Sequence, residues 1–170
     1  MRALLERDEV SPGQPNDFGN TPLFLAAQCG HEGVVKALLE RGEVNPGQPN
    51  DCGNTPLLLA AQGRHQGVVK ALLERDEVDP DKPDNDGDTP LSHAAQGQHE
   101  AVIKILLRRR DVNPGTPARW ARTPLMVAAK GGHGEVVKLL LKREEVNPNM
   151  QDYHGSTPLT LAAEFNMRMW

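Results

Sequence analysis

Aromatic residues, cysteines and long apolar runs are all scarce in this sequence. Aromatic side chains make up 4% of its 170 residues, so a hydrophobic core must be built from Leu, Val and Ala. No apolar run reaches the about 18 residues that a membrane-spanning helix needs, and charge begins too early at the N-terminus for a secretory signal. Two cysteines do not form a disulfide framework, which favours an intracellular setting, cytoplasmic or nuclear.

Motifs for common chemistries are missing as well. There is no glycine-rich phosphate loop, no Gly-x-Ser-x-Gly elbow and no His-Glu-x-x-His pair. A net charge of −4 argues against a basic nucleic-acid binder, and 38% hydrophobic residues are too many for a disordered chain. These absences predict a folded protein that is not an enzyme and has no cofactor, nucleic-acid partner or membrane span.

The sequence instead has proline at regular intervals. All 14 prolines fall into three columns whose members lie 34 residues apart or a multiple of it, and a fixed period of this size indicates a stacked repeat array. The columns are Pro12, Pro46, Pro80, Pro114 and Pro148; Pro15, Pro49, Pro83 and Pro117; and Pro22, Pro56, Pro90, Pro124 and Pro158.

Each repeat has the pattern of two short helices. Thr21 is a suitable N-cap and Pro22 suits the first helical position, and the same Thr-Pro pair recurs in every unit. The second helix ends before Val44-Asn45-Pro46, because the residue before a proline avoids helical geometry. The side chains expected to point inward are Leu23, Leu25, Ala26 and Ala27 in the first helix and Val34, Val35, Leu38 and Leu39 in the second.

Stacking of the repeats supplies the core, because neither helix is long enough to be stable alone. The prediction requires one continuous apolar seam made of Leu38, Leu72, Leu106 and Leu140. The residue after the first proline of each repeat is always a type that tolerates positive φ, which predicts a tight turn there. These residues are Gly13, Gly47, Asp81, Gly115 and Asn149.

This pattern resembles the ankyrin repeat. The stretch Asn50-Asp51-Cys52-Gly53-Asn54-Thr55-Pro56-Leu57-Leu58-Leu59-Ala60-Ala61 follows the family's Asp-x-x-Gly-x-Thr-Pro-Leu-His-x-Ala-Ala, with Asn50 in the place of Asp and Leu58 in the place of His. The resemblance implies an all-α solenoid of stacked helix-turn-helix units with projecting finger loops. The 34-residue repeats are similar to the ankyrin arrays of fungal receptor-like proteins. Their proline-rich fingers argue against the family's finger hairpin, since proline cannot donate to a β-ladder.

The period divides a single domain, residues 1–170, into units. We predict full repeats at 17–50, 51–84, 85–118 and 119–152, with half repeats at 1–16 and 153–170. The half repeats would contribute a second helix around Ala3-Leu4-Leu5 and a first helix from Leu159 to Ala163. Neither end has the polar outer face of a capping repeat, so we expect a piece of a longer array or end-to-end self-association.

In ankyrin repeats, the finger tips and the ends of the first helices form a concave strip that binds other proteins. Here these positions vary between repeats, whereas the core positions barely change. Four aromatic residues, a type enriched at interface hot spots, lie on the strip: Phe18, Trp120, Tyr153 and Phe165. Carried over by position, the resemblance places partner contacts at Phe18, Asn20, Cys52, Asn54, Asp86, Asp88, Trp120, Arg122, Tyr153 and His154 in the fingers and at Gln28, Gln62, Gln96 and Lys130 on the first helices.

Charges of opposite sign gather on neighbouring fingers. The third finger carries Asp84, Asp86 and Asp88, and the fourth carries Arg119 and Arg122. Either these fingers select a partner with the complementary pattern, or they satisfy each other for about 0–1 kcal/mol per pair.

Histidines and acidic residues raise the question of a metal or catalytic site. His31, His65, His99 and His133 form a column, but stacked helices lie about 8–10 Å apart, so column members cannot share an ion and are expected to shape the turn.

His93 replaces an apolar residue, which indicates either a hydrogen-bonded core or groove histidine or a catalytic base or pH switch. The run Asp84-Asn85-Asp86-Gly87 matches a calcium loop only in part, because Lys82 and His93 stand where acidic ligands belong. The sequence therefore predicts no metal site.

Three functions remain open from the sequence. The favoured one is a non-catalytic scaffold that binds a protein partner through the concave surface. The alternatives are a small-molecule binder or enzyme with a groove site around His93, and a structural spacer within a larger receptor-like protein.

Overall fold

The computed structural model describes residues 11–168, with side chains through Glu164. The predicted helix around Ala3-Leu4-Leu5 and the side chain of Phe165 lie outside the described part. The helices, in chain order, are α2 (Pro22–Gln28), α3 (Glu32–Leu39), α4 (Pro56–Gln62), α5 (Gln66–Leu73), α6 (Pro90–Gln96), α7 (Glu100–Leu106), the 3-10 helix η1 (Arg119–Ala121), α8 (Pro124–Lys130), α9 (Gly134–Leu140) and α10 (Pro158–Arg168).

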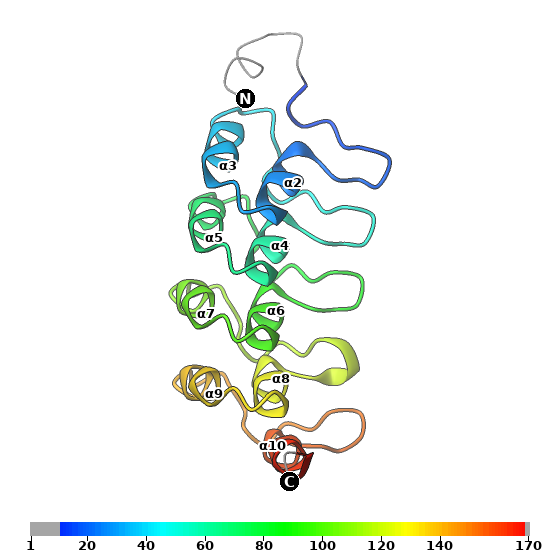
Figure 1. Ribbon diagram of the computed structural model, residues 1–170, viewed down its shortest axis with the longest axis vertical. Coiled ribbons are helices and arrows are strands. Elements are labelled where there is room, and N and C mark those ends of the chain that lie inside the picture. Colours follow the sequence, from blue (N-terminus) through cyan, green and yellow to red (C-terminus); the bar gives the residue numbers. More distant parts are fainter. Residues whose placement is uncertain (1–10, 169–170) are drawn as a thin grey trace.

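Two parallel columns of helices make up the molecule (Figure 1). The first helices α2, α4, α6, α8 and α10 form one column and the second helices α3, α5, α7 and α9 form the other, and each helix contacts its counterpart in the next repeat. The loops between repeats project to one side as fingers. We name finger 1 (16–20), finger 2 (50–54), finger 3 (84–88), finger 4 (118–122) and finger 5 (152–156). The predicted all-α solenoid is confirmed, whereas the predicted repeat boundaries remain a prediction.

Threonine and proline begin the first helices as the sequence predicts. The Thr55 side chain accepts a hydrogen bond from the Leu58 amide at 3.2 Å, and Pro56 occupies the first turn. The same cap is present at Thr21, Thr89 and Thr123. These caps satisfy amides that a seven-residue helix would otherwise leave without partners.

The leucine seam is confirmed. Its four members are no more than 1% exposed and lie in one continuous cluster of buried apolar residues that includes the second helices: Leu38, Leu72, Leu106 and Leu140. Alanine pairs such as Ala60 and Ala61 are fully buried in the same cluster and allow the two helices of a repeat to approach closely. The core is therefore formed by contacts between successive repeats, and a single repeat does not bury its own apolar side chains.

One predicted inward position is wrong. Leu25 is 41% exposed, and its neighbour Phe24 is buried at 3%, packed with Leu58 and Leu59 of the next repeat. Leu59, in the same column as Leu25, is only 8% exposed. Burial at this position therefore depends on which side chains the neighbouring repeats pack against it. The helical periodicity of a single repeat contains no information on those side chains.

The tight turn predicted after the first proline of each repeat is present, and its residues form it without positive φ. The left-handed residues lie in the fingers and between the helices of a repeat. The turn is held by the preceding Asn or Asp, as when Asn45 Oδ1 accepts a hydrogen bond from the Gly47 amide at 3.0 Å. A β-carbon on Gly47 would lie 3.3 Å from the Glu77 carbonyl oxygen, so glycine allows close approach of the next repeat.

Candidate binding surface

The fingers are built around one Asn or Asp side chain at their first residue. Asn50 Oδ1 accepts hydrogen bonds from the amides of Cys52 and Asn54, at 3.1 and 3.0 Å. The residues that do the same in fingers 1, 3 and 5 are Asn16, Asp84 and Asp152. Two backbone bonds close finger 2, from the Asn50 amide to the Asn54 carbonyl and from the Gly53 amide to the Asn50 carbonyl. The described residues contain no strand, in line with the argument from the proline-rich fingers.

Successive fingers are joined to each other. The Asn85 amide of finger 3 donates to the Cys52 carbonyl of finger 2 at 3.1 Å, and the pairs Asp51 to Phe18 and Tyr153 to Trp120 repeat this bond. These three bonds use backbone atoms only, so they do not depend on which residue stands at the finger tip. Side chains add contacts at particular fingers, as when Asn85 Nδ2 donates to the Asp51 carbonyl at 3.0 Å.

Finger 4 departs from the other fingers. Ala118 has no side-chain acceptor for the turn, and Ala121 replaces the usual glycine. Trp120 and Ala121 both adopt left-handed backbone geometry, with φ of 64° and 58°, which costs about 1–2 kcal/mol for each non-glycine residue. Within the described residues, no backbone bond joins fingers 3 and 4, and they are linked instead by an ion pair of 3.6 Å between Arg119 and Asp86.

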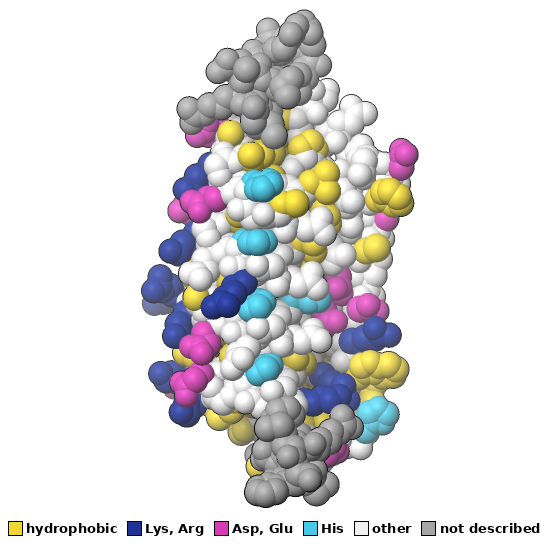
Figure 2. All heavy atoms as spheres, in the orientation of Figure 1, with side chains coloured by type: hydrophobic (Ala, Val, Ile, Leu, Met, Phe, Trp, Pro, Cys, Tyr) yellow, Lys and Arg dark blue, Asp and Glu magenta, His cyan; other side chains and the backbone are white. Residues whose placement is uncertain are grey.

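Aromatic side chains stand at three finger tips. Phe18, Trp120 and Tyr153 are 69%, 50% and 78% exposed. The Trp120 ring stacks on His154 of finger 5, with 6.4 Å between ring centroids. The Arg119 guanidinium lies 5.5 Å from the centroid of the Trp120 ring. Trp120 thus packs on a neighbouring finger, yet half of its surface remains available to a partner. Figure 2 shows apolar side chains at the finger ends and Lys and Arg gathered over the second helices.

None of the predicted partner-contact residues is buried. Ten of them are exposed: Phe18, Cys52, Asp86, Trp120, Tyr153, His154, Gln28, Gln62, Gln96 and Lys130. Four are half-buried: Asn20, Asn54, Asp88 and Arg122. The structure thus places them along one strip of finger and first-helix positions, and their role in binding remains a prediction.

The histidine column ties each repeat to the one before it. His99 Nε2 lies 3.0 Å from the Gln62 carbonyl oxygen, where an Nε2–H donates to the otherwise unsatisfied end of α4. His65 and His133 repeat the contact to Gln28 and Gln96, and Figure 2 shows histidines in a line down this face. Each histidine stands at the N-cap of a second helix without a side-chain cap bond, so it lies at the turn as predicted, and its observed hydrogen bond joins successive repeats.

Replacing one of these histidines should weaken the stack by a small amount. We expect His99→Ala to lower the free energy of unfolding by about 0.5–1.5 kcal/mol, because one hydrogen bond between repeats is lost. Urea unfolding followed by circular dichroism measures the change. His31→Ala is the matched control, since His31 makes no such bond within residues 11–168, and equal losses in both variants would contradict this role.

The basic finger pairs mainly with the finger that follows it. Arg122 Nε lies 3.2 Å from Asp152 Oδ2, and the Asp152 side chain is completely buried. Burial by itself raises the pKa of Asp152, but hydrogen bonds from the Ser156 and His154 amides and from Arg122 outweigh it, so the pKa is lowered. Of the two arginines at the finger tip, Arg119 alone contacts the acidic finger.

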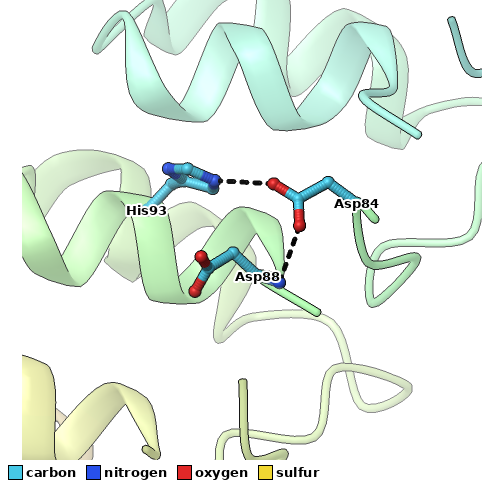
Figure 3. A group of neighbouring side chains, drawn as sticks. All are labelled: Asp84, Asp88 and His93. Carbon is cyan, nitrogen blue, oxygen red and sulfur yellow. Dashed lines mark hydrogen bonds and ion pairs between the residues drawn. The ribbon is translucent and has the colours of Figure 1, made fainter. Parts of the chain in front are cut away.

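His93 lies against the acidic finger. Its Nε2 is 3.3 Å from Asp84 Oδ2, and both side chains are largely enclosed, which confirms the hydrogen-bonded interpretation of this histidine. Asp88 follows Asp84 in the same finger, and its amide donates to Asp84 (Figure 3). The Asp88 carboxylate accepts a 3.3 Å hydrogen bond from the Ser92 hydroxyl. Burial raises the pKa of Asp88; His93 opposes this and the Asp84 carboxylate adds to it. Ligand atoms of Asp84, Asp88 and His93 all lie within 4.8 Å of one another.

Sequence reasoning missed this group of three, although a signal was present. Fingers 1 and 2 have Asn, Asn and Leu at the equivalent positions, so all three columns change together in the third repeat.

An apolar groove lies elsewhere, between α8, α9 and α10, where Leu125, Val137 and Leu159 line it.

The geometry defines a helical repeat solenoid whose regular core carries variable fingers. Comparison with family models identifies the class more closely: ankyrin repeats (3 copies) match residues 43–118, ankyrin repeats (many copies) match 105–162 and a single ankyrin repeat matches 18–51. The chain belongs to the ankyrin repeat family. Such repeats are generally protein–protein interaction modules and are typically non-catalytic.

A search of curated proteins found no match to this chain. No helix within 11–168 is long and apolar enough to cross a bilayer.

Proposed function

We propose that the chain is a non-catalytic scaffold that recognises one protein partner through its fingers and first-helix ends, in an intracellular setting. The observation that carries this proposal is the exposure of Phe18, Trp120 and Tyr153 on fingers whose backbones are fixed by hydrogen bonds. Large, rigid aromatic anchors supply binding energy at little conformational cost when the scaffold is already ordered.

Trp120 has the strongest support as an anchor. Its finger retains two strained backbone conformations that glycine would relieve, and such strain persists where the surrounding structure or a function maintains it. The positive charge of Arg119 beside the ring adds a preference for an acidic or aromatic partner surface. The groove-enzyme alternative has less support, because the apolar groove lies away from His93.

Trp120→Ala should weaken partner binding by at least about 30-fold, which corresponds to a hot spot of about 2 kcal/mol. A partner captured with the wild-type chain is purified, and its affinity for each variant is measured by calorimetry. Leu141→Ala is the matched control, since Leu141 is 49% exposed but follows α9 in the second-helix column. Equal affinity of the wild type and Trp120→Ala would contradict the proposed surface, whereas capture of no partner by either chain would favour the spacer function.

A further inference from the structure

We propose that Asp84, Asp88 and His93 form a binding site for a divalent transition-metal ion, with Zn²⁺ as its typical occupant. The site combines two carboxylates and one imidazole, a ligand set that suits zinc and is poor for Ca²⁺ and Mg²⁺, which prefer oxygen ligands alone. It departs from the sequence expectation that no metal is bound.

The spacing of the ligand atoms fits a tetrahedral ion. Bonds of about 2.0–2.1 Å to zinc separate two tetrahedral ligands by about 3.3–3.4 Å. His93 Nε2 and Asp84 Oδ2 are 3.3 Å apart, and one ligand atom from each of Asp84, Asp88 and His93 lies within 4.8 Å of the other two. The carboxylate oxygen of Asp88 that Ser92 does not hold would take the third position, and a water molecule would take the fourth.

Supporting contacts fix the two carboxylates. Asp84 Oδ1 accepts hydrogen bonds from the Asp86 and Asp88 amides, at 3.0 and 2.9 Å, and leaves Oδ2 facing His93. Asp88 Oδ1 is held by Ser92, whose own hydroxyl is fixed by the capping box with Thr89. Hydrogen bonds of this kind orient ligands at metal sites and raise affinity.

Charge balance also favours a cation. Asp84 and Asp88 bring two negative charges to a largely enclosed position, and neither makes an ion pair with Lys or Arg among the described residues. Arg119 and Arg122, the arginines of finger 4, are engaged by Asp86 and Asp152 instead. A divalent ion would neutralise both carboxylates and allow His93 to bind as the neutral ring.

The repeats themselves provide a variant designed to fold without the site. Asp84→Asn, Asp88→Asn and His93→Leu together restore the residues of finger 2 and its helix, Asn50, Asn54 and Leu59, which sit in the same backbone. Asn50 makes the same two turn hydrogen bonds as Asp84, so finger 3 should keep its shape. Asp88→Asn alone is the milder second variant.

The site is tested on tag-free protein by calorimetric titration with Zn²⁺ and by the visible absorption spectrum of added Co²⁺. Neither measurement requires a protein partner, so this proposal and the proposed function can fail separately. We expect one Zn²⁺ per wild-type chain and the visible absorption bands of a four-coordinate Co²⁺ complex. The triple variant should lose Zn²⁺ affinity by at least about 100-fold, which is more than the loss of a residue that only hydrogen-bonds to a metal ligand would cause. His31→Ala, a distant histidine variant, should bind as the wild type does.

The outcomes that overturn the proposal are equally definite. The site does not exist if the wild type takes up no saturating Zn²⁺, or if the folded triple variant and Asp88→Asn bind it as tightly as the wild type. Two results would together show an acidic cation site in place of a transition-metal site: competition of Ca²⁺ with Zn²⁺ at equal concentration, and Ca²⁺ binding that persists in His93→Leu.

Discussion

Leu72→Ala is expected to lower the free energy of unfolding by about 2–5 kcal/mol, the range for truncating a buried leucine. Leu72 is 0% exposed and lies in the middle of the seam, where α5 contacts both α3 and α7. The loss combines the removed apolar surface with the cavity left between stiff helices. Because stability in such arrays depends on contacts between neighbouring repeats, the cavity should weaken two interfaces at once.

Urea unfolding followed by circular dichroism gives the free energy, and Leu25→Ala is the matched control. Leu25 has the same side chain but is 41% exposed, so its truncation should cost only a small fraction of the loss at Leu72. Similar losses in both variants would mean that the continuous seam does not carry the stability of the stack. A broadened transition in Leu72→Ala would instead locate the weakness at one interface between repeats.

The same repetition made the fold largely predictable from sequence. The Thr-Pro helix starts, the leucine seam and the turn after the first proline were each present in several copies, and a local rule that holds in every copy identifies an element. Leu25 was misassigned because its exposure depends on the neighbouring repeat, which a single repeat's periodicity does not describe. The residue type of Gly47 predicted a tight turn, which is present, and the Asn45 side chain closes that turn without positive φ.

The candidate site was predictable only in outline. Its strip followed from the family resemblance, but the individual contacts depend on side-chain geometry across fingers. Arg122 could have paired with either neighbouring finger, and it pairs with Asp152 because that carboxylate is the buried turn acceptor of finger 5. His93 meets Asp84 across nine positions of the chain, a distance at which sequence spacing gives no direct geometry.

Asp152→Ala should destabilise the last described finger by about 2–4 kcal/mol, the second large effect we expect. The substitution leaves Arg122 without its partner and removes the acceptor for the His154 and Ser156 amides. Urea unfolding monitored by tryptophan fluorescence gives the free energy, and hydrogen exchange of these two amides reports the local loss. Asp152→Asn is the matched control, since Asn16 and Asn50 hold equivalent fingers; it should lose only the ion pair, about 1 kcal/mol.

The pH dependence of this pair separates charge from turn geometry. Because the pKa of Asp152 is lower in the folded chain than in the unfolded chain, the folded state binds fewer protons, and its stabilising contribution is present above the ordinary value of about 3.9. It is lost as pH falls through the folded pKa. The stability gap between the wild type and Asp152→Asn should therefore be full near neutral pH and close in acid. A gap that stays constant across this window would show that Arg122 packs against the finger without stabilising the carboxylate charge.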